Sequence, residues 1–362
     1  MKPTPFFPAW RASLAPLGLR TAQTLKKVRA LTLCRLESSL GTWMPADVFP
    51  KATCKQNSRD RIYTRSRTFW CMLWQSLNPN ASGREVVRQL QALFGLEQGP
   101  NISQEDGAYC RAKARLNMSE FPKALGAVAK SADRLCPALP LLQGRPLKAV
   151  DGSTTTLADT RANRTAYPPP PCNSSAPCFP VMRVAVIFSM LSGAILAAAQ
   201  ASLHVSELDL MHSLATQLTA QDIVVGDRGF GNFPFIAWLR YALQVDFIGR
   251  TTHNIDGRRR LKRLGRSDWL VYFKRAYTPS PWLSALEWAG LPQSMTLRAI
   301  KGSCRKKGFR VRQVTVVTTL LDPKLYPAQQ IMDAYLRRWR LEMCLDDLKT
   351  TLQMEMLRGR TP

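Results

Sequence analysis

Between residues 147 and 249 the chain consists of short apolar runs separated by turn residues, and this pattern constrains its fold more than any other feature of the sequence. The runs cover residues 147–157, 183–190, 194–202, 223–225 and 245–249. Their lengths and their alternation of apolar with polar residues predict β-strands. The pair Ser192-Gly193 is placed to turn one hairpin, and residues 235–243 have a helical pattern. Because strands and helices alternate, the segment predicts an α/β fold with a mixed sheet.

Two of these runs carry an aspartate beside a glycine. Asp151 precedes Gly152, and Asp227 follows Gly226. Phosphoryl transfer with two metal ions needs anionic oxygen ligands that converge from separate elements, so a carboxylate at a strand end is a candidate ligand. An aspartate next to a glycine is also a common turn residue. Each aspartate taken alone therefore leaves both interpretations open.

A helix predicted from about Pro327 to Met354 carries the third candidate acid. At about 100° per residue, four polar residues share one stripe about 60° wide, bordered on both sides by apolar residues. These residues are Tyr335, Arg338, Glu342 and Lys349. A polar stripe between two apolar ones is expected where a buried helix presents functional groups to a cleft. An ion pair between Arg338 and Glu342 is the alternative, and Asp346 is a rival carboxylate.

At these residues the sequence resembles a known family. The spacing Tyr335-x2-Arg338-x3-Glu342-x6-Lys349 is similar to the signature of the insertion-sequence-four family of DDE transposases. The segments Asp151-Gly152-Ser153 and Gly226-Asp227-Arg228-Gly229-Phe230 resemble the blocks that carry its first two acids. Further similar stretches lie at residues 67–70, 107–112, 158–163 and 179–180. The resemblance runs from about residue 60 to the C-terminus, and the combination of signature and blocks is specific.

The resemblance implies an RNase H-like fold, in which a mixed sheet has flanking helices, Asp151 and Asp227 lie on neighbouring strands, and a β-rich insertion precedes the last acid. It favours Glu342 over Asp346 and implies that Asp151, Asp227 and Glu342 bind two Mg²⁺ or Mn²⁺ ions. One ion activates water, or later a 3′-hydroxyl, and the other stabilises the leaving oxygen.

The resemblance also implies phosphate contacts near the cleavage point. Tyr335, Arg338 and Lys349 are expected there, with Arg338 as a bidentate fork and Lys349 as a point charge. Arg228, beside the second acid, is a further expected DNA contact. Members of this family often release DNA through a hairpin while an aromatic residue of the insertion holds a displaced base. Trp282 and Trp288 are candidates for that role, although no motif matches.

The charge of the chain favours a polyanionic partner. Lys and Arg number 51 against 25 Asp and Glu, which gives a net charge of +26. Residues 250–312 hold 16 basic and 3 acidic residues, a net of +13 and half of the total. The densest run predicts contacts with DNA phosphates. It contains Arg258, Arg259, Arg260, Lys262 and Arg263. The alternative is that this run is a solvated surface and that the interleaved aromatic residues form a core.

These patterns predict five segments. They are residues 1–60, a basic N-terminal arm; 61–140, a helical DNA-binding domain; 141–250, the first part of an RNase H-like catalytic core; 251–320, a basic β-rich insertion; and 321–362, the closing helix of the core. No apolar run reaches the ~18 to 20 residues of a membrane span. The nine cysteines include no Cys-x-x-Cys pair, so neither a disulfide framework nor a zinc ribbon is indicated. We expect a bacterial cytoplasmic protein that associates with the nucleoid.

The leading hypothesis is a transposase that binds terminal inverted repeats, pairs the DNA ends as a homodimer and transfers strands by cut-and-paste. The alternatives are an RNase H-like metal-dependent nuclease and a non-catalytic DNA-binding regulator of transposition. Metal-dependent cleavage separates the regulator from the two enzymes. Gly359 is expected to end the long helix, and Thr361-Pro362 is a typical start for another. We therefore expect further helices beyond this chain, and a truncated product that binds DNA but cleaves it poorly.

Overall fold

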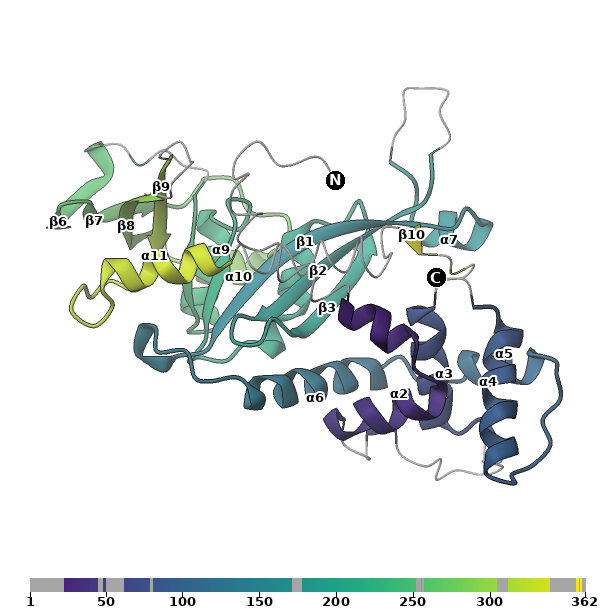
Figure 1. The fold of residues 1–362 in the computed structure, drawn as a ribbon. Coiled ribbons are helices and arrows are strands. Elements are labelled where there is room, and N and C mark those ends of the chain that lie inside the picture. The colour runs from purple at the N-terminus through teal and green to yellow at the C-terminus, as the bar shows by residue number, and fades with distance from the viewer. Residues whose placement is uncertain are drawn as a thin grey trace. The chain divides into compact units, whose positions relative to one another are not determined.

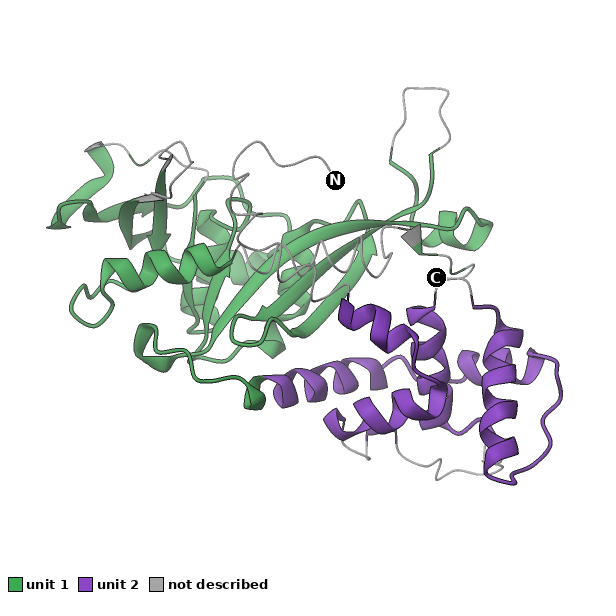
Figure 2. Ribbon diagram, viewed as in Figure 1, with its two compact units in different colours: residues 1–15, 133–350, 354–362 green, residues 16–132, 351–353 purple. Residues whose placement is uncertain are grey.

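The computed structural model describes residues 23–44, 48–49, 62–78, 81–170, 178–251, 255, 257–304, 312–338, 356–357 and 359. The chain divides into two compact units (Figure 2). One is drawn from residues 1–15, 133–350 and 354–362, and the other from residues 16–132 and 351–353. The first unit is α/β and the second is helical. In the described ranges, no helix is both long enough and apolar enough to cross a membrane.

One ten-stranded sheet forms the frame of the α/β unit (Figure 1). Its strands are β1 (Leu147–Leu157), β2 (Val181–Ser189), β3 (Ile195–Ser202), β4 (Ile223–Gly226), β5 (Asp246–Gly249), β6 (Arg260–Gly265), β7 (Asp268–Lys274), β8 (Ser294–Cys304), β9 (Arg312–Thr318) and β10 (Met356–Leu357). The order is β3-β2-β1-β4-β5-β9-β8-β7-β6, and β10 pairs with β1. Strands β1, β4 and β5 are parallel, and β10 is parallel to β1, whereas the other neighbours are antiparallel.

The five strands predicted between residues 147 and 249 are confirmed, with ends that differ by at most two residues. Strands β2 and β3 form the expected hairpin, in which Gly193 adopts a φ of +79° that favours glycine. The predicted helical segment 235–243 is α9 (Phe233–Ala237) followed by a π-helical turn, η5 (Trp238–Ala242). The mixed α/β class is therefore confirmed.

Helices cover both faces of this sheet. The helices of the unit are α7 (Arg161–Ala166), α8 (Glu207–Ser213), α9, α10 (Ala285–Gly290) and α11 (Ala328–Arg337), with short 3-10 turns at η3 (Leu142–Gly144), η4 (Ala215–Gln217) and η6 (Gly257–Arg259). Apolar residues of α8, α9, η5 and α10 pack in one hydrophobic cluster with one side of the strands. Helix α11 packs in the cluster on the opposite side, through Ile331, Met332 and Ala334. Alternation of side chains along the strands explains how one sheet supports two cores.

The helical unit has its own core. Its helices are α2 (Leu33–Leu40), α3 (Arg65–Leu77), α4 (Gly83–Leu96), α5 (Gly107–Ala114) and α6 (Glu120–Leu135), with a 3-10 turn at η1 (Gly41–Trp43). Trp70, Leu90 and Tyr109 are buried where α3, α4 and α5 meet. Ser82 caps α4 as its sequence predicts, since its hydroxyl accepts a bond of 3.2 Å from the Glu85 N–H.

The end of the chain differs from the sequence prediction. The helix expected to reach about Met354 is described as far as Arg338, and the segment beyond it lies outside the described residues. Met356 and Leu357 are not a helical continuation but strand β10, which pairs with Thr156 and Leu157. Strand β1 is paired with the short β4 only through residue 149, so its remaining edge is open for another strand.

The start of α10 leads to a pH-dependence prediction. The Glu287 carboxylate accepts bonds from the Ser284 N–H (2.9 Å) and hydroxyl (2.6 Å), and its other oxygen lies 2.7 Å from Nε2 of His212. The Ser284 bonds, followed by the His212 contact, lower the pKa of Glu287 from 4.5 to about 2. A lowered pKa stabilises the fold above the unfolded value, and this contribution is lost as the pH falls toward 2.

We therefore expect Glu287→Gln to lower the thermal midpoint at pH 7 and to have a diminishing effect between pH 4.5 and 2. Thermal unfolding across this range measures the difference. Glu97→Gln, at an exposed glutamate, is the control. A Glu287→Gln effect that is constant with pH would show that the carboxylate charge is unimportant.

Candidate active site

Asp151 lies on β1, and Asp227 directly follows the neighbouring parallel strand β4. In the pairing of β1 with β4, Ala149 lies opposite Val225. Asp151 is two residues beyond Ala149, and Asp227 is two residues beyond Val225. The pairing of β1 with β4 stops before these residues, and its register places Asp227, directly after β4, next to the part of β1 that holds Asp151. The resemblance implied that the two acids lie on neighbouring strands, and β1 and β4 are indeed neighbours.

Both aspartates project toward helix α11. Side chains two residues apart on a strand point to the same face of the sheet. Ala149 and Val225 belong to the hydrophobic cluster that contains Tyr335 of α11. Asp151 follows Ala149 by two residues on β1 and so lies on the same face, and Asp227, in the turn after β4, lies close enough to Tyr335 to raise its pKa. This arrangement faces the two carboxylates toward the helix that carries the polar stripe.

The turn after β4 fixes the orientation of Asp227. Its Oδ1 accepts hydrogen bonds from the N–H groups of Gly229 (2.7 Å) and Phe230 (3.3 Å). The turn also packs closely against the end of β5, because a Cβ at Gly231 would lie 1.6 Å from the Arg250 carbonyl oxygen. Only glycine allows that approach. The backbone therefore holds the Asp227 carboxylate in one orientation.

Tyr335 lies within the electrostatic reach of the second aspartate. Its side chain is 2% exposed and that of its neighbour Arg338 is 5% exposed. Burial raises the pKa of Tyr335, and Asp227 raises it further, whereas the charges of Arg338 and Arg250 and a hydrogen bond from Arg338 oppose the shift. Tyr335 is therefore a neutral hydroxyl at pH 7, surrounded by groups from three separate elements.

Arg250 is a site residue that the sequence analysis missed. It directly follows β5, and Ile248, two residues earlier, packs in the same cluster as Tyr335. Gly249 pairs with Gly226, so both strands end in a glycine followed by a charged residue. This repeated pattern of apolar strand, glycine and charged residue was the signal available in the sequence.

Substitutions of Tyr335 test its structural contribution. We expect Tyr335→Phe to lower the free energy of unfolding by ~1 kcal/mol, because it removes one hydrogen bond and keeps the packed ring. Tyr335→Ala should cost ~3 to 5 kcal/mol, because it leaves a cavity beneath α11. Urea unfolding monitored by circular dichroism measures both. Equal effects of the two variants would contradict the buried position of the ring.

Comparison with known proteins identifies the family. The family described as "Transposase DDE domain" matches residues 142–362, a range that includes both aspartates and α11. This chain belongs to the DDE transposase family. The protein named "Transposase InsG for insertion sequence element IS4" of Escherichia coli (strain K12) is 22% identical over 334 residues, which cover 90% of this chain and 71% of the relative. The resemblance to the insertion-sequence-four family is thus confirmed.

A solved structure is also similar, at a lower level. It is the "Cryo-EM structure of piggyBac transposase synaptic complex with hairpin DNA (SNHP)". The match covers 95% of this chain and 70% of that chain, with 10% identity and a TM-score of 0.39. This similarity is too low to carry an argument about the fold or the site.

The basic run of the transposase lies on the edge strand of its sheet. Arg258 precedes β6, and Arg260, Lys262 and Arg263 are exposed on it. Arg259 is half-buried. The Arg260 guanidinium lies 4.4 Å from the centroid of the Trp269 ring, which orients it. Arg228, in the turn after β4, is exposed.

The two tryptophans suggested as base-holding residues are part of the core. Trp282 is 6% exposed and Trp288 is 8% exposed, and both pack in the cluster with α8 and α9. The Trp282 ring lies 5.7 Å from that of Trp238, edge to face. A buried ring has no free face on which a base can stack, so nothing in this structure supports the suggestion for either residue. Tyr272 and Tyr277 of the same segment are exposed.

The remaining signature residues cannot be placed. Glu342 and Lys349 lie outside the described residues. Within the part of the chain that the structure describes, no group of three or more His, Cys, Asp or Glu side chains is positioned to hold a metal ion. Of the three acids expected to bind metal, the structure describes Asp151 on β1 and Asp227 after β4.

Proposed function

We propose that this DDE transposase binds the terminal inverted repeats of an insertion sequence, cleaves their strands and joins the 3′-hydroxyl ends to target DNA. The observation that carries the proposal is the placement of Asp227, directly after β4, next to the part of β1 that holds Asp151, near the helix with Tyr335. Membership of the DDE family supports the chemistry. We further propose that two copies pair the two ends, in the bacterial cytoplasm at the nucleoid.

We propose that the core is RNase H-like and that Asp151, Asp227 and Glu342 hold two divalent ions, Mg²⁺ or Mn²⁺. The described residues fit such ions, because carboxylate oxygens are the hard ligands they prefer and the two aspartates come from separate elements. Glu342 follows Arg338 by four residues, a spacing that predicts the same helical face. Bound there, the ions supply a nucleophile at neutral pH and stabilisation of the leaving oxygen.

The other residues of the site would bind and orient the DNA. Arg338 and Arg250, both near the Tyr335 hydroxyl, offer guanidinium groups suited to a phosphate. Lys349 and Arg228 would add positive charge near the cleaved bond. Tyr335 and Arg338 are nearly covered in this structure, so their contact with a phosphate requires a movement when DNA enters.

A second DNA contact is proposed on the basic segment before and along β6. Its members are Arg258, Arg259, Arg260, Lys262 and Arg263. Edge strands expose their outer side, and cations on such a strand can follow a DNA backbone without reading its sequence. The helical unit would recognise the DNA end, with exposed Arg111 and Arg115 on and after α5.

The test begins with the DNA that flanks the gene, in which short inverted repeats define the substrate. Purified protein is incubated with a labelled repeat end or with a scrambled end, in Mg²⁺ or in EDTA. We expect cleavage only at the repeat end and only with Mg²⁺. Equal cleavage of both ends would identify a nuclease, and binding without cleavage would identify a regulator.

A further inference from the structure

Arg298, in the middle of β8, is a fully buried cation far along the chain from the carboxylates of the site. Its side chain is 0% exposed, and no residue with a larger side chain is buried so completely among the described residues. A buried guanidinium is costly unless all of its donors are satisfied. The groups that satisfy Arg298 therefore define its role.

One side of the guanidinium binds Asp268, the first residue of β7. Nη2 donates to Oδ2 at 2.6 Å, and Nε donates to Oδ1 at 2.9 Å. This is the bidentate geometry in which Arg and a carboxylate fit best. Asp268 pairs with Gly265 where β6 turns into β7, so it lies at the turn of the β6–β7 hairpin, called here the basic hairpin because β6 carries Arg260, Lys262 and Arg263.

The other side of the guanidinium binds the segment that leads into α11. Nη1 donates to the carbonyl oxygen of Tyr326 at 2.6 Å and lies 3.4 Å from that of Asp322 and 3.5 Å from that of Leu320. Helix α11 begins two residues after Tyr326. A single side chain thus joins the turn of the hairpin to the start of the helix that carries Tyr335.

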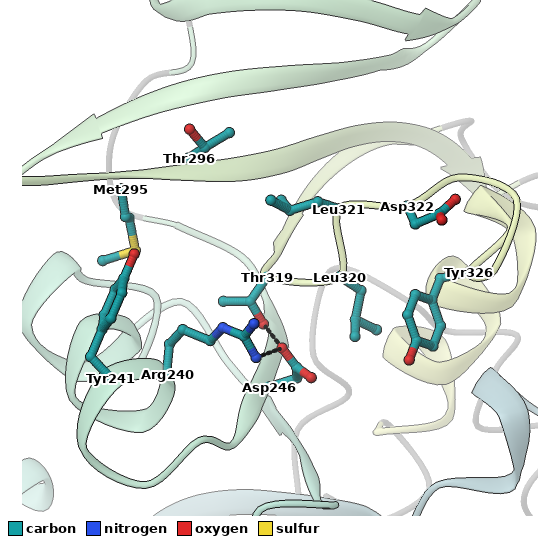
Figure 3. Close-up of a pocket in the computed structure, with 10 residues that line it drawn as sticks. All are labelled: Arg240, Tyr241, Asp246, Met295, Thr296, Thr319, Leu320, Leu321, Asp322 and Tyr326. Atoms are coloured by element: carbon teal, nitrogen blue, oxygen red, sulfur yellow. Dashed lines mark hydrogen bonds and ion pairs between the residues drawn. The ribbon is translucent and has the colours of Figure 1, made fainter.

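The segment from Leu320 to Tyr326 borders a cavity (Figure 3), and besides Arg298 it is held by Gln143, which donates to the Leu325 carbonyl oxygen, and Arg145, which donates to the Tyr326 hydroxyl. The cavity has a volume of about 490 Å³ and is lined by Leu320, Leu321, Asp322 and Tyr326, among others. Leu321 is 38% exposed. Figure 3 also shows Asp246 beside Arg240 and Thr319, which ties the residue before the segment to β5.

We infer that Arg298 is a positioning residue for the active site: it fixes the start of α11, and hence Tyr335 and Arg338, relative to the basic hairpin. It touches neither DNA nor the reacting atoms. The effect on DNA cleavage rests on the proposed function, whereas the effect on α11 does not.

Two variants separate positioning from mere stability. Arg298→Met with Asp268→Leu replaces the ion pair by apolar side chains, a change that often leaves stability unaffected, but it removes the bonds to the segment. Asp268→Asn keeps Arg298 and its bonds to the carbonyl groups but weakens the buried pair, so it should be less stable. If Arg298 positions α11, the cleavage rate should fall in the double variant, which lacks the bonds to the carbonyl groups, and not in Asp268→Asn. If Arg298 only stabilises the fold, the variant with the lower thermal midpoint should have the lower cleavage rate.

The measurements are amide hydrogen exchange of residues 328–337, the thermal midpoint, DNA affinity and the cleavage rate at saturating DNA. For the double variant we expect exchange about tenfold faster and cleavage about 10- to 100-fold slower, with DNA affinity unchanged, because a small displacement of catalytic groups has effects of that size. Asp268→Asn should keep wild-type exchange in α11 and most of the cleavage rate.

Unchanged exchange in the double variant would overturn the inference. If the double variant does not fold, Arg298→Lys replaces it, because one ammonium group cannot reach both Asp268 and the carbonyl groups as the fork does. Its unchanged exchange would overturn the inference equally. If the wild-type protein does not cleave DNA, the proposed function fails, and exchange alone decides whether Arg298 positions α11.

Discussion

Asp227→Asn lowers the rate of DNA strand cleavage by at least about a thousandfold, because metal ions contribute several kcal/mol to such reactions and each 1.36 kcal/mol is tenfold. The asparagine carbonyl can still accept the bonds from Gly229 and Phe230, so the turn should remain folded. DNA affinity should change by less than about threefold, since it comes mainly from cation–phosphate contacts. Gel assays of cleavage and of binding measure the two effects separately.

Asp151→Asn and Glu342→Gln are expected to have the same effect as Asp227→Asn. The matched control is Glu207→Gln. The Glu207 carboxyl group packs against Gly152, so it is close to Asp151 along β1 but on the opposite face of the sheet. It should cleave at the wild-type rate. Substantial cleavage by Glu342→Gln would move the third acid to Asp346, which should then be tested.

Neutralising the basic run is expected to weaken DNA binding at every sequence. The variant replaces Arg258, Arg259, Arg260, Lys262 and Arg263 by glutamine. Each phosphate contact that is lost should lower the slope of log affinity against log salt by about 0.9, and affinity should fall by at least about a hundredfold if all five make contacts. Discrimination between repeat and scrambled ends should persist, since these contacts carry no sequence information.

A single substitution in the run has a matched control elsewhere in the α/β unit. Arg263→Gln removes an exposed cation on β6, and Arg164→Gln removes an exposed cation on α7 that is paired with Asp159. We expect only Arg263→Gln to change the salt slope. Equal slopes for both variants and the wild-type protein would mean that the run is a solvated surface.

The strands and the two aspartates were predictable because their signals are local. A strand is recognised in the sequence by alternating apolar and polar residues. The ends of β4 and β5 are recognised by a glycine followed by a charged residue. The adjacency of β1 and β4, by contrast, depends on pairing between segments that are about 75 residues apart in the chain. No local pattern contains that register, so the neighbouring position of the two strands was expected from the family resemblance and not from the residues themselves.

The aromatic residues of the insertion show the limit of reasoning from composition. Exposed Tyr277 and buried Trp282 stand five residues apart in similar sequence surroundings. Their exposure depends on α8 and α9, which pack on the insertion from far along the chain. Arg298 is a similar case, because nothing in its sequence neighbourhood indicates that a cation will be fully buried. Such features follow from tertiary packing alone.

Strand transfer tests the central claim most directly. A repeat end with a free 3′-hydroxyl is incubated with a circular target plasmid, and joined products are separated by size. The account predicts that the wild-type protein and Glu207→Gln join the end to the plasmid in Mg²⁺ but not in EDTA, and that Asp151→Asn and Asp227→Asn form no product. Joining by either aspartate variant, or by the wild-type protein without a divalent ion, would contradict it.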